Sequence, residues 1–330
     1  MKLNVIGDPD QVETNEVDKN AMGGTELMKY ALQKKVDPAI LDKFQIIPSR
    51  VRKIEKGKIP ILWLHDLPGD PESKHLADGG WEKFEKIVCV SHWQRQQYQN
   101  HYGIPASKLV VLQNAIEPLP NHEKPNPKKC VNIIYHTTPH RGLELLIPVM
   151  DWLEENLKDV DWHLDVYSSF NIYGWGERDA PYKPLFDRID SSDKMTNHGF
   201  VSNEEVHKAL QKAHIFALPS IWPETSCIAM IEAMSAGCIC VHSSLAALPE
   251  TTANWSLMYD FTEDKDQHAT SMALLLADAI QLIGDPSMVD RMEMQKAYAD
   301  GFYNWEVRAK QWEGFLIKIL RSKGIELNGK

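Results

Sequence analysis

Short apolar runs alternate with helical patterns along the whole chain, and this alternation is the feature that most limits the fold. The first part carries KLNVIG, FQIIPS, IPILWLH, KIVCVS and LVVLQ, and the second carries VNIIYHT, WHLDVYSS, IFALPS, CICVHSS and SLMYDF. Because apolar and polar residues do not alternate cleanly in these runs, we expect strands that are buried on both faces. The sequence therefore predicts an α/β protein with two doubly wound parallel sheets covered by helices.

A proline-rich segment separates the two series of predicted strands. Residues 116–130, IEPLPNHEKPNPKKC, contain four prolines and no hydrophobic periodicity, which is typical of a linker. We therefore predict a first domain over residues 1–122 and a second domain over residues 123–304, which suits a chain of 330 residues. After SLMYDF, apolar residues recur at three- and four-residue spacing, and the last such stretch predicts a helix over residues 305–330.

The charge and the cysteine content indicate which kinds of binding partner and which cellular compartment are favoured. The chain has 36 Lys and Arg against 46 Asp and Glu, and this net charge of -10 disfavours a nucleic-acid partner. Its five cysteines form no CxxC pair, which favours a reducing compartment. We find no signal peptide and no apolar stretch long enough to span a membrane. We expect a cytoplasmic protein, or one peripheral to a membrane, with a homodimer as the commonest oligomer.

Two loops of the predicted second domain follow strands, where an open parallel sheet binds its ligands. Arg141 follows VNIIYHT at the start of a helix, and the loop after IFALPS turns into a helix near Ser226. Free backbone N–H groups and the positive dipole end at that helix start favour an anion, which Arg141 could also bind. A phosphate group is the anion that we expect there.

Two glutamates lie eight positions apart around that helix start. Glu224 precedes the helix, and Glu232 lies roughly two turns inside it. A carboxylate that accepts hydrogen bonds from vicinal hydroxyls is a common way to hold a ribose. With amides between them for phosphates, the two glutamates would suit a nucleotide sugar. The alternative is a solvated helix face, against which the apolar neighbours of Glu232 argue.

The predicted first domain offers a paired glycine and a histidine. Gly23 and Gly24 directly precede a helix, where they would let the backbone approach an anionic ligand. The alternative is an ordinary loop with Thr25 as the helix cap. His65 follows the run IPILWL at the carboxyl end of a strand, where it is either a site residue or a structural histidine.

Dinucleotide and metal motifs are missing from the sequence. The segment IGDPDQ lacks the later glycines of a GxGxxG fingerprint, which disfavours a nicotinamide dehydrogenase. The histidines show no HExxH spacing, so we expect no metal ligands. Asp159 and Asp161 form a DxD, but this pair precedes a strand and is interpreted as a loop.

The sequence resembles glycosyltransferase family 4, a group of retaining enzymes with the two-domain GT-B fold. The most specific match is NHGFVSNEEVHKALQKAHIFALPSIWPETSCIAMIEAMSAGCICVHSSLAALPE, which includes the two glutamates separated by seven residues. Further matches are GGTE, KIVCVSHWQRQQY, VLQNAIEP and NWEVRAKQWEGFL, so the resemblance covers most of the chain. In that family the last helix crosses back onto the first domain, which we expect here from Trp305 onward.

The resemblance assigns roles to the candidate residues. It implies that Glu224 contacts the donor sugar, that Glu232 holds the nucleotide ribose, and that His65 lies beside the donor sugar. The implied ligands of the diphosphate are the backbone of Thr225, Ser226, Cys227 and Ile228, the glycines Gly23 and Gly24, and Arg141. Many family members also carry an earlier arginine, where this chain has His136. Arg141 keeps the later cation of that pair, but His136 is neutral at most working pH values unless its pKa is raised, so its replacement of the earlier arginine is an open question at this point.

The implied function is a metal-independent, retaining transfer of a hexose to a hydroxyl of a glycan or other acceptor. GDP-mannose and UDP-glucose are the donor types that the family suggests, and no cofactor, metal or protein nucleophile is expected. The alternatives are a nucleotide-sugar epimerase or hydrolase of GT-B fold, a transferase acting on modified DNA, and a silent binding protein. The predicted first domain is short and has little sequence with which to build an acceptor pocket, so the sequence does not identify the acceptor.

Overall fold

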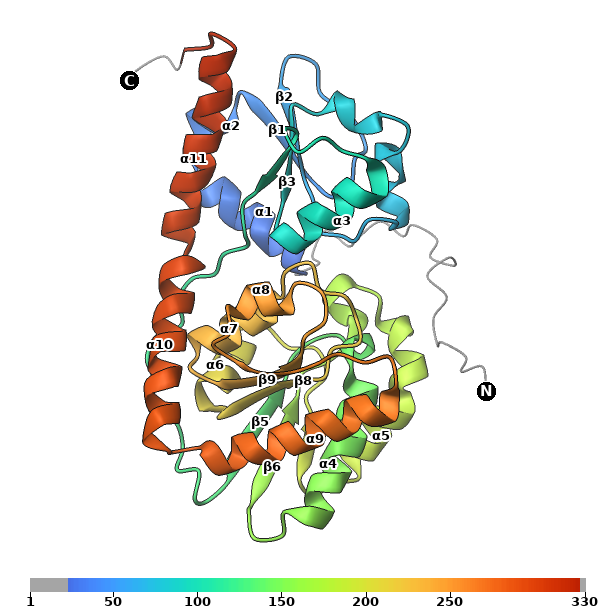
Figure 1. Ribbon diagram of the computed structural model, residues 1–330, viewed down its shortest axis with the longest axis vertical. Helices are drawn as coiled ribbons and strands as arrows, with labels where there is room; N and C mark the ends of the chain where they lie inside the picture. The colour runs from blue at the N-terminus through green and yellow to red at the C-terminus, as the bar shows by residue number, and fades with distance from the viewer. Residues whose placement is uncertain (1–22, 327–330) are drawn as a thin grey trace.

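The computed structural model describes residues 23–326, which form two parallel sheets with helices on both faces (Figure 1). The first sheet has the strand order β1-β2-β3-β4, and the second has the order β10-β9-β8-β5-β6-β7. Every strand pair in these residues is parallel. The prediction of two doubly wound sheets is confirmed, while the predicted strand KLNVIG lies outside the described residues.

The elements follow the predicted alternation of strands and helices. The first domain contains α1 (Gly24–Lys35), α2 (Pro38–Leu41), β1 (Phe44–Pro48), β2 (Ile59–Trp63), the 3₁₀ turns η2 (Pro71–Leu76) and η3 (Gly80–Lys83), β3 (Lys86–Cys89), α3 (His92–Tyr102) and β4 (Leu109–Val111). The second domain contains β5 (Val131–Tyr135), η4 (Pro139–Arg141), α4 (Leu143–Asn156), β6 (Trp162–Val166), η5 (Phe170–Tyr173), η6 (Gly176–Tyr182), α5 (Lys183–Asp190), β7 (Met195–Asn197), α6 (Asn203–Lys212), β8 (Ile215–Leu218), α7 (Ile228–Ser235), β9 (Ile239–Ser243), α8 (Leu248–Thr252) and β10 (Leu257–Tyr259). Three helices follow: α9 (Lys265–Leu282), α10 (Pro286–Phe302) and α11 (Trp305–Ser322).

The first sheet is buried on both faces, as its apolar runs predict. Ile61 and Trp63 of β2 pack into a cluster with α1 and α11. Leu62 and Leu64, which point the other way, pack into a second cluster that includes Tyr98 of α3. Alternate residues of one strand therefore contribute to two cores, which explains why its sequence shows no polar alternation.

The second sheet encloses the larger core, which combines β5, β6, β8 and β9 with side chains from α4, α7 and α9. All five residues of β9 and all four of β8 are buried. The strand β7 was not predicted, because its three residues at the edge of the sheet are mostly polar and too short for a pattern.

The chain crosses between the two domains twice, and the two crossings lie side by side. Ile116 and Asn304 form a parallel bridge. The Ile116 N–H donates to the Tyr303 carbonyl oxygen at 2.7 Å, and the Trp305 N–H donates to the Ile116 carbonyl oxygen at 3.2 Å. The passage into the second domain and the return from it are thus joined by backbone hydrogen bonds.

The segment after the first crossing already packs on the second domain. The Leu119 N–H donates to Ser235 Oγ at 2.9 Å, and Lys296 Nζ donates to the Leu119 carbonyl at 2.6 Å. Lys124 Nζ donates to the Ala213 carbonyl oxygen at 2.5 Å. The proline-rich linker is therefore held against α7, α10 and the end of α6 in the second domain, and the division at residue 122 stays a prediction of the sequence.

Helix α11 packs along the first domain (Figure 1). Asn304 caps it by accepting a hydrogen bond from the Glu306 N–H at 2.7 Å. Its buried face includes Trp312, whose ring centroid lies 4.9 Å from that of Trp63 in β2. The second crossing thus returns the chain to cover the face of the first sheet that α1 covers only in part.

Helices α9 and α10 belong to the second domain. α9 contacts α4 and β9, and α10 contacts α7. Among residues 23–326, no single helix has the length and apolar character needed to cross a membrane. The bent pair of α9 and α10, at 104°, meets that test only when the two helices are taken together.

Truncating Trp312 tests the packing of α11 on the first domain. We expect Trp312→Ala to lower the free energy of unfolding of the first domain by about 3–5 kcal/mol, because it opens a cavity against Trp63. Val307 lies on the same helix but is 40% exposed, so Val307→Ala should change that free energy by less than about 0.5 kcal/mol. Urea unfolding followed by tryptophan fluorescence measures both variants, and equal losses would contradict the prediction.

Candidate active site

Arg141 is positioned by the loop that follows β5. The short 3₁₀ turn η4 ends at Arg141, and Gly142 then starts α4 with a φ of 131°. A Cβ at Gly142 would lie 2.1 Å from the carbonyl oxygen of Pro219, which follows β8. Only glycine allows this conformation and this close approach. The loops after two neighbouring strands are thereby packed directly together, as the carboxyl edge of a parallel sheet requires.

Arg141 and Glu224 form a buried ion pair at that edge. Arg141 Nη1 donates to Glu224 Oε1, and Arg141 Nε donates to Thr138 Oγ1 at 3.0 Å. Glu224 is only 5% exposed. Arg141 Nη2 makes no hydrogen bond with any residue in the range 23–326 and stays available to a ligand. The structure thus brings together two of the predicted site residues, as direct partners.

The pair fixes the charge of the arginine. Burial by itself lowers the pKa of Arg141, but the charge and hydrogen bond of Glu224 outweigh it, and the net pKa is raised. Arg141 therefore stays cationic over the whole range in which the protein is folded. Because Glu224 stays beside it, the guanidinium of Arg141 can bind an anion and is still paired with a carboxylate after the anion leaves.

Helix α7 begins at Ile228, just after Glu224. Its N-cap residue, Cys227, has no side-chain hydrogen bond to the helix, and the first helical bond runs from the Ile231 N–H to the Cys227 carbonyl oxygen. The first turn therefore offers backbone N–H groups without helical acceptors. Thr225 and Ser226 lie in the preceding bend, so the helix starts two residues later than predicted.

The N-terminus of α1 faces the same place from the first domain. Gly23 is the N-cap of α1 and makes no side-chain cap. A Cβ on Gly24 would lie 3.0 Å from Ile228 Cδ1, and one on Gly23 would lie 2.4 Å from Tyr173 Cε1. The two glycines thus allow the starts of α1 and α7 to meet, which places two positive helix ends together. Tyr173, in η5, is a neighbour of this point that the sequence did not reveal.

His65 lies at the junction of the two domains. Its N–H donates to Ser49 Oγ at 3.0 Å, and its carbonyl oxygen accepts a hydrogen bond from Thr225 Oγ1 of the second domain at 2.7 Å. Its Nε2 is buried and has no partner among residues 23–326. Burial lowers the pKa of His65 to about 3, so the imidazole is neutral at physiological pH.

His136 follows β5 and is also neutral. Burial lowers its pKa to about 4, although the charge of Glu232 acts in the opposite direction. Its ring lies 4.8 Å from that of Phe216, and its Nε2 has no partner within residues 23–326. His136 can therefore offer a hydrogen bond to a ligand, but not a positive charge.

Glu232 has a partner that the sequence did not identify. Its Oε1 lies 3.0 Å from Nε2 of His207, which is in α6. The hydrogen bond to Glu232 raises the pKa of His207, although burial opposes this. Glu232 is thus neither a solvated residue nor an unpaired buried one. No short-range signal connects two residues 25 positions apart, so only the fold could reveal the pair.

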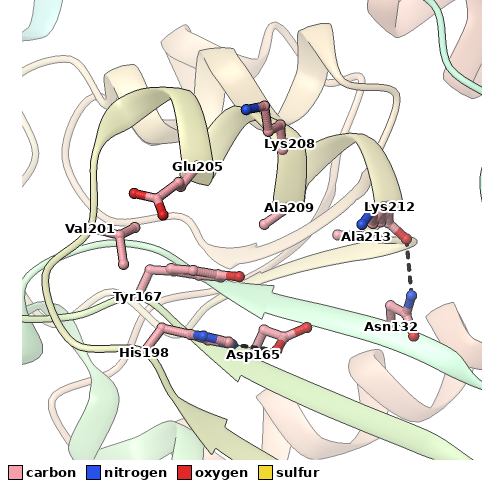
Figure 2. Close-up of a pocket in the computed structure, with 10 residues that line it drawn as sticks. All are labelled: Asn132, Asp165, Tyr167, His198, Val201, Glu205, Lys208, Ala209, Lys212 and Ala213. Carbon is pink, nitrogen blue, oxygen red and sulfur yellow. Dashed lines mark hydrogen bonds and ion pairs between the residues drawn. The ribbon is translucent and has the colours of Figure 1, made fainter.

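A surface pocket of about 370 Å³ lies on the side of α6 that is opposite to His207 (Figure 2). Its wall includes Asp165, which accepts a hydrogen bond from His198 at 2.7 Å, and Tyr167, whose ring stacks on that of His198. Glu205 contributes from α6, two positions from His207 and therefore on the other face of the helix. The predicted site residues do not line this pocket, so it is separate from the Arg141 site.

Comparison with known proteins agrees with this geometry. The family described as glycosyl transferases group 1 matches residues 117–293, which is more than half of the 330-residue chain. The chain belongs to the glycosyl transferases group 1 family. The match includes Arg141, Glu224 in the loop after β8, and Glu232 in α7. By family, the protein is a glycosyltransferase.

Relatives and solved structures of this glycosyltransferase are distant in sequence. The chain is 22% identical over 236 residues to a phosphatidylinositol N-acetylglucosaminyltransferase subunit of Arabidopsis thaliana, with 69% of this chain and 48% of the relative covered. It thus spans less than half the length of that relative. A glycosyltransferase from Rickettsia africae superposes with a TM-score of 0.63 at 16% identity, covering 94% of this chain and 85% of that one. The pneumococcal O-GlcNAc transferase GtfA, in complex with UDP and GlcNAc, gives a TM-score of 0.63 at 11% identity over 89% and 60%. These similarities confirm the GT-B fold.

The His207–Glu232 pair predicts a pH-dependent stability. Because the folded pKa of His207 is raised, the pair stabilises the fold fully below the unfolded pKa, and this contribution is lost as the pH rises through the folded pKa. We expect His207→Gln to cost about 0.5 kcal/mol at pH 5.5 and less at pH 8.5. Urea unfolding at both pH values measures this, with the exposed His122→Gln as the control. A cost that grows with pH would contradict the prediction.

Proposed function

We propose that this glycosyltransferase moves a sugar from a nucleoside diphosphate sugar to an acceptor hydroxyl. The observation that carries the proposal is the meeting of the N-termini of α1 and α7 beside Arg141. Two positive helix ends and one guanidinium make a place for a group with several negative charges. A diphosphate fits this description, and a carboxylate next to it suits hydroxyl groups.

The proposed diphosphate ligands come from both domains. Arg141 Nη2 and the N–H groups of Ile228 and its preceding bend, Thr225 to Cys227, face the leaving diphosphate from the second domain, while Gly23 and Gly24 approach it from the first. The neutral imidazole of His136 gives a hydrogen bond instead of the charge of an arginine. Its buried Nε2, which has no partner within residues 23–326, supports this role.

The two glutamates take different parts of the donor. Glu224, paired with Arg141 beside the diphosphate, accepts hydrogen bonds from the donor sugar. Glu232, a little more than one turn inside α7, accepts hydrogen bonds from the ribose, while His207 orients its carboxylate. His65 offers Nε2 to the donor sugar from the first domain, since that nitrogen is buried and has no partner within residues 23–326.

The proposed reaction retains the anomeric configuration and needs neither a metal nor a protein nucleophile. The bond from the anomeric carbon to the β-phosphate oxygen breaks while the acceptor oxygen bonds to the same face of that carbon. The proton of the acceptor hydroxyl passes to the departing phosphate oxygen. Charge on the phosphate is stabilised by Arg141 and the two helix ends, which are fixed before the reaction begins. His65 remains neutral throughout, because its pKa is lowered to about 3.

UDP-N-acetylglucosamine is the first donor to test. The relatives are named for transfer of N-acetylglucosamine, and a neighbour of the same fold was solved with UDP and GlcNAc. UDP-glucose and GDP-mannose, which the sequence suggested, complete the panel. Calorimetric titration of all three should show one donor binding clearly more tightly, and binding of none would refute the proposed donor site.

The acceptor and the competing functions are separated by product analysis. The relatives are named for phosphatidylinositol, so an inositol lipid is the first acceptor to offer, followed by simple glycans. A hydrolase or epimerase would consume the donor equally well without an acceptor. A transferase acting on DNA would bind duplexes with a steep dependence on salt, which the net charge of -10 opposes. A cytoplasmic or membrane-peripheral location and a homodimer also belong to the proposal.

Removing the guanidinium of Arg141 should impair the chemical step. We expect Arg141→Gln to lower kcat/KM by about a hundredfold or more, since one preorganised charge at the leaving group is lost. Arg188→Gln is the control, because Arg188 pairs with Asp151 on the surface of α4 and α5. Steady-state kinetics with the best donor measures both, and a loss under about threefold for Arg141→Gln would contradict its role.

The two glutamates should differ in what they recognise. Glu232→Gln should weaken binding of UDP and of the UDP-sugar alike by about tenfold, because both contain the ribose. Glu224→Gln should weaken the UDP-sugar but leave UDP within about twofold, because only the former carries the sugar. Calorimetry with the two ligands gives the four affinities. The opposite pattern would exchange the two assignments.

A further inference from the structure

Glu250 makes a contact across the two domains that the donor site does not explain. Its Oε1 accepts a hydrogen bond from the His92 N–H at 2.8 Å, and its Oε2 accepts one from the Trp93 N–H at 2.9 Å. These are the first two residues of α3 in the first domain, whereas Glu250 lies in α8 of the second. The third N–H of α3, from Gln94, is capped locally by Ser91 Oγ at 3.0 Å.

The contact is favourable on both electrostatic and geometric grounds. A carboxylate at a helix N-terminus binds amides that have no helical acceptor and interacts with the positive end of the dipole. Both oxygens of Glu250 are used, which fixes the orientation of the carboxylate as well as its distance. Any rotation that separates the domains removes both hydrogen bonds together.

The second domain holds Glu250 firmly on its side. The Ala247 N–H, just before α8, donates to the carbonyl oxygen of Glu224 at 3.1 Å. Tyr303 Oη, at the return crossing, donates to the carbonyl oxygen of Thr251 at 2.9 Å. α8 is thus tied at one end to the donor-site loop and at the other to the crossing between the domains.

On the side of the first domain, α3 is tied to the loop that carries His65. Gln94 Nε2 donates to the carbonyl oxygen of Asp66 at 2.9 Å, and Tyr98 Oη donates to the same oxygen at 3.1 Å. The carbonyl oxygen of the preceding residue, His65, accepts the hydrogen bond from Thr225. α3 is thus hydrogen-bonded to the residue that directly follows His65.

We propose that Glu250 is a positioning residue that caps α3 across the domain boundary and thereby sets His65 against the donor sugar. The inference rests on the proposed donor site and adds a residue that does not touch the donor. Glu250 acts through α3 and Asp66. The hydrogen bond from Thr225 to the His65 carbonyl oxygen then joins this loop of the first domain to the donor-site loop of the second. The two domains are held in register by this cap on one side and by the Thr225–His65 hydrogen bond on the other.

Amide hydrogen exchange tests the contact itself, without reference to activity. In the full-length protein we expect Glu250→Ala to speed exchange at His92 and Trp93 by about tenfold or more, because both amides lose their acceptor. Glu250→Gln keeps one acceptor oxygen and should speed exchange chiefly at one of the two. Glu293→Ala, an exposed glutamate of α10, is the matched control and should change neither amide. Unchanged exchange in Glu250→Ala overturns the proposal.

Kinetics then separates a positioning role from a purely structural one. We expect Glu250→Ala to lower kcat by roughly ten- to a hundredfold, because misplacing a group at the reacting centre by about 1 Å costs that much. The affinity for UDP should stay within about twofold, since the proposed UDP ligands lie in the second domain and at the start of α1, and neither Glu250 nor α3 contributes one of them. Glu250→Gln should recover part of the lost kcat. Faster exchange with an unchanged kcat, or an equal loss of kcat and UDP affinity, overturns the positioning role.

The design distinguishes failure of this inference from failure of the proposed function. If the wild-type protein transfers no sugar from any donor of the panel, the proposed function fails while the exchange experiment still decides whether Glu250 caps α3. If the wild-type protein is active and the two variants behave as Glu293→Ala does, the proposed function stands and the role of Glu250 is refuted.

Discussion

The parallel bridge between Ile116 and Asn304 is the constraint on which the arrangement of the two domains depends. Because the chain leaves the first domain and returns to it at one place, the two passages behave as a single two-stranded connection. Lys296 and Ser235 bind the linker on the second-domain side, and Trp312 anchors the return helix on the first. Both passages of the chain between the domains are therefore fixed at the same place, on the second domain by the linker and on the first by α11.

Both carboxylates of the site have a partner before any ligand arrives. Glu224 pairs with the guanidinium of Arg141, and Glu232 lies against the imidazole of His207, whose pKa is raised by their hydrogen bond. A donor that binds here would therefore form hydrogen bonds with side chains that are already paired with one another. The first turn of α7 contains no acidic residue, whereas the carboxylate of Glu26 lies in the first turn of α1, so the positive end of α7 is the less neutralised of the two. This arrangement lets the site attract a diphosphate and still release it.

The sequence predicted much of the fold because the information was local. Apolar runs such as residues 59–64 identify a strand that is buried on both faces, and the prolines of residues 116–130 mark the passage between the two sheets. Strand β7 was missed because three mostly polar residues at an edge form no pattern. Element boundaries also shifted slightly, as with the start of α7 at Ile228.

The residues of the candidate site could also be predicted only where the signal was local. Arg141, Glu224 and Glu232 follow strands or lie in one helix, so local position and a family resemblance together made them candidates, and their roles stay proposals. His207, Tyr173 and Glu250 were not found, because each acts on a residue that is distant in sequence: Glu250 and His92 are 158 positions apart. The neutral state of His136 was expected from its ordinary pKa, and the structure adds that burial lowers this pKa to about 4, which spacing alone does not report.

The discontinuous first domain has a consequence for how the protein is made. While the ribosome is still synthesising the chain, residues 23–116 lack the helix that completes their core, because Trp305, Trp312 and Leu316 are the last part of it to appear. The second domain, from the linker to α10, is contiguous and can fold first. The part of the chain that emerges first should then be the last to reach its native state, exposing the Trp63 face of its sheet to chaperones in the meantime.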